Sequence, residues 1–215
     1  MVDYFLLVLA GMFIGVAVSA PVGAVNLICI RRSLEHGQLN GMMAGIGSVL
    51  GDGVFAMIAA FGLHAVRDAV MAQEHIIGAI GGLVLIGMGV YSYFKPPPDE
   101  TQLGRAKLVS NWTDDLPHAI GSTLFLTLTN PATMLGFAVF FASLQEFFGT
   151  ITLIGSWLLV GAVMVGSTLW WFGITTVAAQ FHGKLTRDHF WMINRIFGAL
   201  IAAFGFAVWI SLLFY

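Results

Sequence analysis

The 215-residue sequence is poor in charged residues, which make up 9% of the chain, whereas a soluble globular domain has about 25%. So few charges cannot cover the surface of a soluble fold of this size, and most of the surface must therefore face lipid. The formal net charge of −2 argues against binding to nucleic acid. The single cysteine, Cys29, excludes an internal disulfide and any two-cysteine zinc or redox motif.

Basic residues are missing from the first 18 positions, although Val18-Ser19-Ala20 would pass as a signal-peptidase cleavage site. Residues 1–18 contain no Lys or Arg and do contain Asp3. A secretory signal peptide needs a basic N-terminal region. We therefore expect the first apolar segment to be retained as a helix.

The sequence also lacks the patterns typical of a metal centre or an enzyme. None of the six histidines has another histidine four residues away, and no cysteine or acidic cluster accompanies them. No nucleophile–base pairing or phosphate-binding loop is present. We predict no metal, no cofactor and no enzymatic activity.

What the chain does contain is six apolar stretches, each close to the length of about 20 residues that crosses a bilayer. They lie near 4–30, 40–63, 76–94, 119–144, 151–179 and 196–215. All Lys and Arg residues except Arg67 fall in the first, third and fifth connections between these stretches. Because basic loops stay in the cytoplasm, this distribution predicts that both termini lie on the periplasmic or extracellular side.

A polar linker over 95–118 divides the chain into halves 1–94 and 119–215, each with three predicted spans. An odd number of spans per half means that any repeat between the halves is inverted, as in many transporters. Polar breaks around a proline occur in the first span of each half, at 19–27 (SAPVGAVNL) and 127–133 (TLTNPAT). The predicted fold is an all-α membrane protein of six transmembrane helices in two inverted three-helix repeats. Helices 1 and 4 are broken at Pro21 and Pro131.

The paired breaks are candidates for a substrate site, since interrupted helices in corresponding positions are the best sequence indication of a transporter site. The alternative is that each proline only kinks its helix, which neighbouring helices can tolerate. Gly23 would give access to the backbone, and Ser19 would supply a polar partner. The amides of Asn26 and Asn130 either contact the substrate or cap the broken half-helices.

Asp52 is the only acidic residue well inside a predicted span. A carboxylate at the bilayer centre costs about 2.5–3.5 kcal/mol, and such residues usually face a cavity or a partner. Asp52 could attract a substrate ammonium group, carry a proton, or pack as a neutral acid against a neighbouring helix. Ser167 and Trp170 occupy the matching part of the fifth span. Arg31 either orients the chain or draws anionic groups to the cytoplasmic mouth.

The motifs resemble those of the LysE/RhtB family of bacterial amino-acid exporters. In the first half these are 21–27 (PVGAVNL), 31–37 (RRSLEHG) and the Gly-x-Gly-x-x-x-Gly-Asp pattern over 45–52. In the second half, 128–131 (LTNP) is similar to the family's LNP break, and 194–198 (NRIFG) opens the last helix. The resemblance covers essentially the whole chain.

The resemblance implies a six-helix inner-membrane protein that exports amino acids or close derivatives, driven by the membrane potential or by proton antiport. It is compatible with a homodimer. By the family's pattern, the residues around the substrate path would be Pro21, Gly23, Asn26, Asp52, Asn130 and Pro131. This sequence departs from the pattern at Ala20, where many members have glycine before the proline, so no particular substrate is carried over.

We therefore predict a secondary exporter that works by alternating access, with an amino acid, a coupling proton and the lipid bilayer as its partners. Half-helix N-termini suit a carboxylate, while freed carbonyls and Asp52 suit an ammonium group, so a zwitterion matches both. The alternative is a divalent-cation exporter of related architecture. That function should place several acidic, His or Cys ligands inside the spans, where only Asp52 qualifies.

Overall fold

The computed structural model describes residues 3–21, 23–65, 74–96, 116–149, 151–180 and 187–211. In these parts the chain is all-α, with eight helices and no strand. The helices are α1 (Tyr4–Ser19), α2 (Ala24–His36), α3 (Gln38–Ala65), α5 (Glu74–Phe94), α7 (Leu116–Leu128), α8 (Pro131–Phe148), α9 (Leu153–Gln180) and α10 (Arg187–Ser211).

The helices give the chain the character of a multi-pass membrane protein. α3, α9 and α10 each contain a segment that is long and apolar enough to cross a bilayer. Two further candidates are bent pairs: α1 and α2 meet at 85°, and α7 and α8 meet at 61°. The described helices thus provide three candidate spans, or up to five if each bent pair counts as one. The apolar part of α5 that is described, Gly82–Phe94, is shorter.

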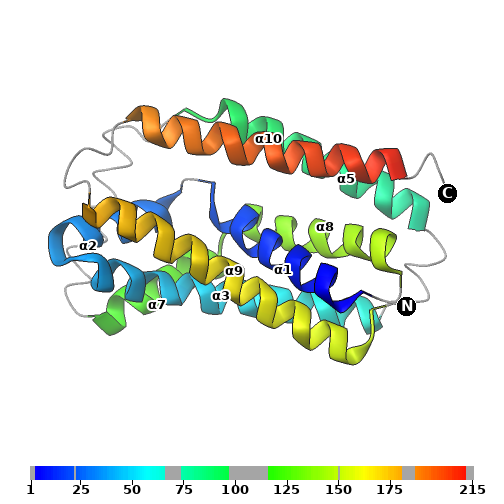
Figure 1. Ribbon diagram of the computed structural model, residues 1–215, viewed down its shortest axis with the longest axis horizontal. Helices are drawn as coiled ribbons and strands as arrows, with labels where there is room; N and C mark the ends of the chain where they lie inside the picture. Colours follow the sequence, from blue (N-terminus) through cyan, green and yellow to red (C-terminus); the bar gives the residue numbers. More distant parts are fainter. Residues whose placement is uncertain are drawn as a thin grey trace.

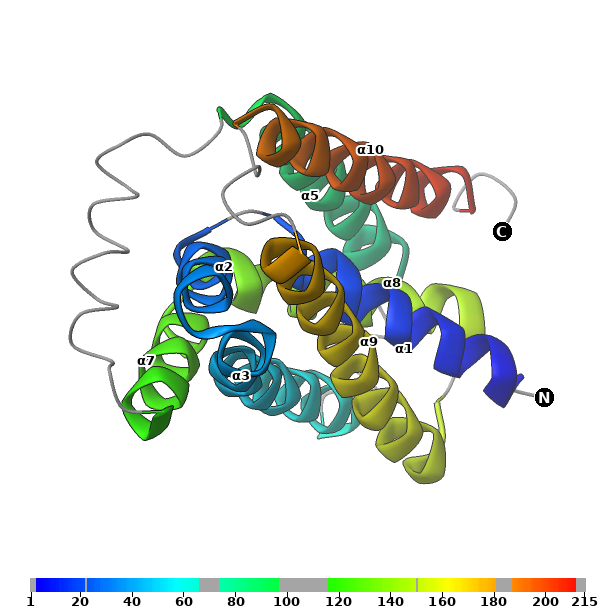
Figure 2. The same ribbon diagram turned by 60° about the vertical axis from the view of Figure 1, so that its left-hand side comes forward.

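The helices divide into a main group and a pair (Figures 1 and 2). In the main group α1 packs on α9, α7 packs on α3, and α3 packs on α9. α5 and α10 lie side by side along their length, and α5 connects this pair mainly to α8. Close α5–α10 packing depends on glycines, because a Cβ at Gly89 or Gly198 would overlap the backbone of the opposite helix.

Local sequence explains where the bent pairs are interrupted. α1 begins where the Asp3 carboxylate accepts from the amides of Phe5 and Leu6, at 3.0 and 3.3 Å, and it ends at Ser19. α2 starts five residues later, after Pro21. In the second pair, α7 ends at Leu128 and Pro131 is the first residue of α8, where the missing N–H of proline costs nothing.

The connection between α2 and α3 is shorter than the sequence predicts. We expected the polar stretch from Arg31 to Gln38 to separate two spans, but α2 continues to His36. Gly37 alone makes the turn, with a φ of 87° that favours glycine. α10 likewise begins at Arg187, within the expected fifth connection.

Some predictions fall on residues that the structure does not describe. They are most of the predicted linker, residues 97–115, and the basic residues Arg67, Arg105, Lys107 and Lys184.

Candidate functional site

Close packing of α1 on α9 brings two buried serines together. A Cβ at Gly15 would overlap the backbone of Val163 and Ser167, so only glycine allows the two helices to approach this closely. One helical turn after Gly15, the Ser19 hydroxyl lies 2.9 Å from the Ser167 hydroxyl. The last residue of α1 therefore meets the middle of α9.

The Asp52 carboxylate on α3 completes a cluster with these serines, which we call the Asp52 cluster (Ser19, Asp52 and Ser167). The same oxygen, Oδ2, lies 3.0 Å from Ser19 Oγ and 2.6 Å from Ser167 Oγ. The exposed fractions of Ser19, Asp52 and Ser167 are 7%, 2% and 0%. Three helices thus hold a buried carboxyl group within hydrogen-bond reach of two hydroxyls.

Asn26 bridges the interruption between α1 and α2. Its Nδ2 donates to the carbonyls of Ser19 and Pro21, at 3.1 and 3.3 Å, and its Oδ1 accepts from Trp170 Nε1 at 3.3 Å. Carbonyls that have no partner within a helix are therefore paired by a side chain from the following helix. Both ends of the Asn26 amide are occupied within the protein.

The end of α7, next to the interruption between α7 and α8, contacts α3 at Ser48, which lies one turn before Asp52. Thr127 Oγ1 donates to Ser48 Oγ at 3.0 Å. Asn130 caps α8, because its Oδ1 accepts from the Ala132 amide at 3.0 Å, and its side chain is otherwise exposed. The two interruptions therefore reach the same helix, α3, at successive turns.

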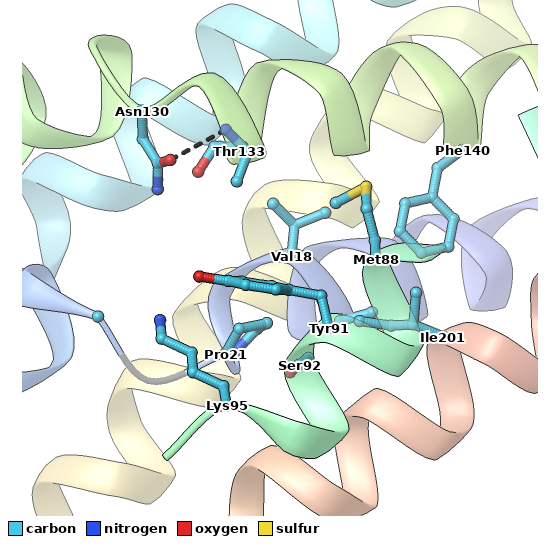
Figure 3. A pocket seen from close by; sticks show the side chains of 13 residues that line it. Val18, Pro21, Met88, Tyr91, Ser92, Lys95, Asn130, Thr133, Phe140 and Ile201 are labelled. Carbon is cyan, nitrogen blue, oxygen red and sulfur yellow. Dashed lines mark hydrogen bonds between the residues drawn. The ribbon is translucent and has the colours of Figure 1, made fainter. Parts of the chain in front are cut away.

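A cavity of about 290 Å³ lies between the two interruptions and α5 (Figure 3). We call it the break cavity. Its wall includes Pro21 and Gly23 from the first interruption, and Asn130, Ala132 and Thr133 from the second. Lys95, directly after α5, also lines the cavity. The remaining lining residues come from α1, α5, α8 and α10, and are Ala17, Val18, Met88, Tyr91, Ser92, Phe140 and Ile201.

The lining of the break cavity favours negative charge. Gly23 is the N-cap of α2 and Asn130 caps α8, so two helix N-termini with partial positive charge open onto the cavity. Lys95 follows the end of α5, and Figure 3 shows its ammonium group on the same side as the Tyr91 hydroxyl and Asn130. Partial burial lowers the pKa of Lys95. No acidic side chain is among the described lining residues.

The structure divides the residues predicted from the sequence between these two places. Ser19, Asn26, Asp52, Ser167 and Trp170 lie at or beside the Asp52 cluster. Pro21, Gly23 and Asn130 line the break cavity, and Pro131 begins α8 next to it. Arg31 lies on α2 and is not among the residues that line the cavity. Asp52 does not line it either.

Sequence reasoning missed the contribution of α5 to the cavity. The sequence indicated Lys95 only as one of the basic residues that set the orientation, and the third span only as an apolar stretch near 76–94. The available signal was the polar end of that span, where Tyr91 and Ser92 precede Lys95. That this end faces the two interruptions depends on the packing of α5 on α8, which sequence spacing does not specify.

Comparison with known proteins identifies related sequences. The sequence profile of the LysE type translocator family matches residues 16–212. The chain is 24% identical over 199 residues to "Putative amino acid efflux protein YcgF" of Bacillus subtilis (strain 168), and the match covers 90% of each chain. No solved structure matches the chain significantly.

Proposed function

The chain belongs to the LysE type translocator family, and from this premise we propose that it exports amino acids or close derivatives across a bacterial inner membrane. The observation that carries the proposal is the break cavity, on which two helix N-termini and Lys95 converge. The name of the Bacillus subtilis relative, which refers to amino acid efflux, supports the same substrate class.

The polar groups of the cavity suit the two charges of an amino acid. The substrate carboxylate binds beside Lys95 and the N-termini of α2 and α8, whose positive charge and partial positive charges attract it. The ammonium group faces the C-terminal end of α1, where Ala17 and Val18 line the cavity. The last carbonyls of a helix carry partial negative charge and lack partners within the helix.

The Asp52 cluster is the proposed carrier of a coupling proton. Its three oxygens make three mutual contacts, but two serine hydroxyls supply only two hydrogens. In the structure both hydroxyls donate to Asp52 Oδ2, which leaves no hydrogen for the contact between Ser19 and Ser167. A proton on Asp52 reverses the first of these bonds, so that Asp52 donates to Ser19 and Ser19 donates to Ser167, while Ser167 still donates to Asp52. The neutral carboxyl group therefore satisfies every contact, and loss of the proton leaves one contact without a hydrogen.

The end of α1 links the proposed proton site to the proposed substrate site. Val18 and Pro21 line the break cavity, whereas Ser19 between them contacts Asp52. Release of the proton changes the partners of Ser19, and this shifts the backbone that forms the cavity wall. Proton binding and substrate binding are coupled in this way through one short segment.

Alternating access follows from the arrangement of two inverted halves with six spans, which we propose on the basis of helix pairing. α1 packs on α9 as α7 packs on α3, and these pairs correspond when the halves are exchanged. The α5–α10 pair breaks the correspondence, because α5 packs on α8 while α10 makes no comparable contact with α2 in the described ranges. In the opposite-facing state, α10 packs on α2 instead. With six spans both termini lie on the same side of the membrane, and the basic connections make this the periplasmic or extracellular side in the proposal.

The alternative of a divalent-cation exporter calls for a set of acidic, His or Cys ligands. In the described residues no group of three such side chains could hold a metal ion. We keep the amino-acid exporter as the proposal because a lysine, not an acidic cluster, lines the cavity.

Counterflow in proteoliposomes tests the proposed function. Vesicles containing the purified protein and loaded with unlabelled amino acids are supplied with the same labelled amino acids outside. We expect wild-type protein to accumulate label, Lys95→Gln to slow the exchange at least about tenfold, and Lys95→Arg to restore most of it. If wild-type protein and Lys95→Gln exchange amino acids at the same rate, the break cavity is not the substrate site. No exchange by folded wild-type protein would refute the proposed function.

A further inference from the structure

We propose that the break cavity selects amino acids with an apolar, uncharged side chain of about leucine or methionine size. This inference rests on the proposed export function and names the substrate class of the same site. A cavity of about 290 Å³ is slightly smaller than the range of about 300–1,000 Å³ found for small-molecule sites. It therefore holds one small molecule, whose orientation is set by the polar groups of the wall.

The cavity has a polar end and an apolar end, which fixes how an amino acid lies in it. Figure 3 shows the Lys95 ammonium group, the Tyr91 hydroxyl and Asn130 on one side. The apolar side chains on the other side are Val18, Met88, Phe140 and Ile201. A carboxylate held at the polar end directs the side chain of the amino acid toward the apolar end.

A second charge at the apolar end meets no charged side chain in the described wall. The described lining residues include one lysine and no acidic side chain, so the side-chain cation of Lys or Arg finds no counter-ion there. A second carboxylate, as in Asp or Glu, would leave water for a wall of aliphatic and aromatic groups. Both cases lose hydration without compensation, and the cavity discriminates against them.

Gly136 on α8 is not a lining residue, but it lies directly behind two residues of the apolar end. A Cβ at this position would lie 3.4 Å from Met88 Cε and 3.6 Å from Val18 Cγ2, both of which belong to the cavity wall. These are ordinary van der Waals distances, so a small side chain here fits without displacing the helix. The additional methyl groups of valine occupy space that a long substrate side chain would otherwise use.

A mixed-substrate efflux experiment tests the inference directly. Proteoliposomes are loaded with an equimolar mixture of all proteinogenic amino acids, and those that leave are measured by mass spectrometry. We expect Leu, Ile, Val and Met to leave at least about tenfold faster than Lys, Arg, Asp and Glu. Gly136→Val slows the efflux of leucine and methionine and spares that of alanine. The matched control is Gly87→Val on α5, since a Cβ at Gly87 has no atom within 4 Å.

Three other outcomes would contradict the selectivity, the position of the substrate side chain or the export function, respectively. If Lys, Arg, Asp or Glu leaves as fast as leucine, the inferred selectivity is wrong and the export function stands. If Gly136→Val and Gly87→Val give the same substrate profile, the apolar end does not hold the side chain. If no amino acid leaves vesicles whose protein is folded by thermal-unfolding assay, the proposed function itself fails.

Discussion

At the scale of single residues, Asp52 is the group whose position most needs an explanation. A carboxyl group inside a span is costly and is usually retained for a function. Here it contacts only hydroxyl groups among the hydrogen-bond partners that the structure describes, from Ser19 on α1 and Ser167 on α9. A site without a fixed cation suits a group that alternates between a neutral and a charged form, which is the role we propose.

Replacing Asp52 by asparagine tests that role without changing the size of the side chain. We expect Asp52→Asn to lower export at least about tenfold, because the amide cannot bind and release a proton. The protein should still reach the membrane, since the asparagine oxygen can accept from Ser167. Rates of efflux from proteoliposomes and the amount of protein in the membrane are the two measurements.

The control is Asp188→Asn, which makes the same chemical change at an exposed residue near the start of α10. This variant should export at the wild-type rate. Wild-type efflux by Asp52→Asn would rule out a role for Asp52 in coupling or binding.

At the scale of elements, the sequence predicts a broken helix at each of two prolines. In the described residues α1 ends at Ser19, shortly before Pro21, and Pro131 begins α8 after α7 has ended at Leu128. Proline within an apolar run restricts the helix locally, so Pro21 and Pro131 can be recognised without any tertiary information. The partners of Asp52 could be named as candidates, but not paired with it. Their pairing depends on the close approach of α1 and α9 at Gly15, a contact between residues about 150 positions apart that no local pattern encodes.

Gly15 therefore offers a test of how the Asp52 cluster is assembled. We expect Gly15→Ala to destabilise the protein by about 1–3 kcal/mol, because its Cβ would overlap the α9 backbone and force α1 away. Efflux should fall as well, since Ser19 would move away from Ser167. Melting temperature in detergent and efflux rate measure the two effects.

Gly161→Ala on α9 is the matched control, because a Cβ there has no atom within 4 Å. It should leave efflux unchanged and should not lower the melting temperature, because alanine favours a helix more than glycine does. If Gly15→Ala matches Gly161→Ala in stability and efflux, helix proximity at Gly15 does not hold the cluster together.

At the scale of the whole molecule, the α5–α10 pair is the element that we propose to move. It is joined to the main group chiefly through α5 and α8, and it supplies one wall of the break cavity. The sequence could not indicate this, because an apolar stretch predicts that a helix lies in the membrane but not which helices it packs against. The sequence also does not indicate that α5 packs on α8 while its counterpart α10 has no comparable contact with α2 in the described residues.

Fixing α5 to α8 should therefore stop transport. In a Cys29→Ser protein, Met88→Cys and Gly136→Cys place two thiols on facing helices, as the contact of Met88 with a Cβ at Gly136 indicates. Because both positions adjoin the cavity, efflux of alanine is measured, and we expect a short bifunctional thiol reagent to abolish it in the double variant but only to lower it in each single variant. Unchanged efflux by the cross-linked protein would contradict a movement of α5 relative to α8.

The most direct test of the central claim, that this protein exports amino acids, is to compare cells with and without it. Both are fed a library of dipeptides, which raises the internal concentration of each amino acid, and amino acids inside and outside are then measured. We predict that cells with the protein release at least one amino acid faster and retain less of it, and that Lys95→Gln removes the difference. Identical internal and external profiles in cells with and without the protein would contradict the account.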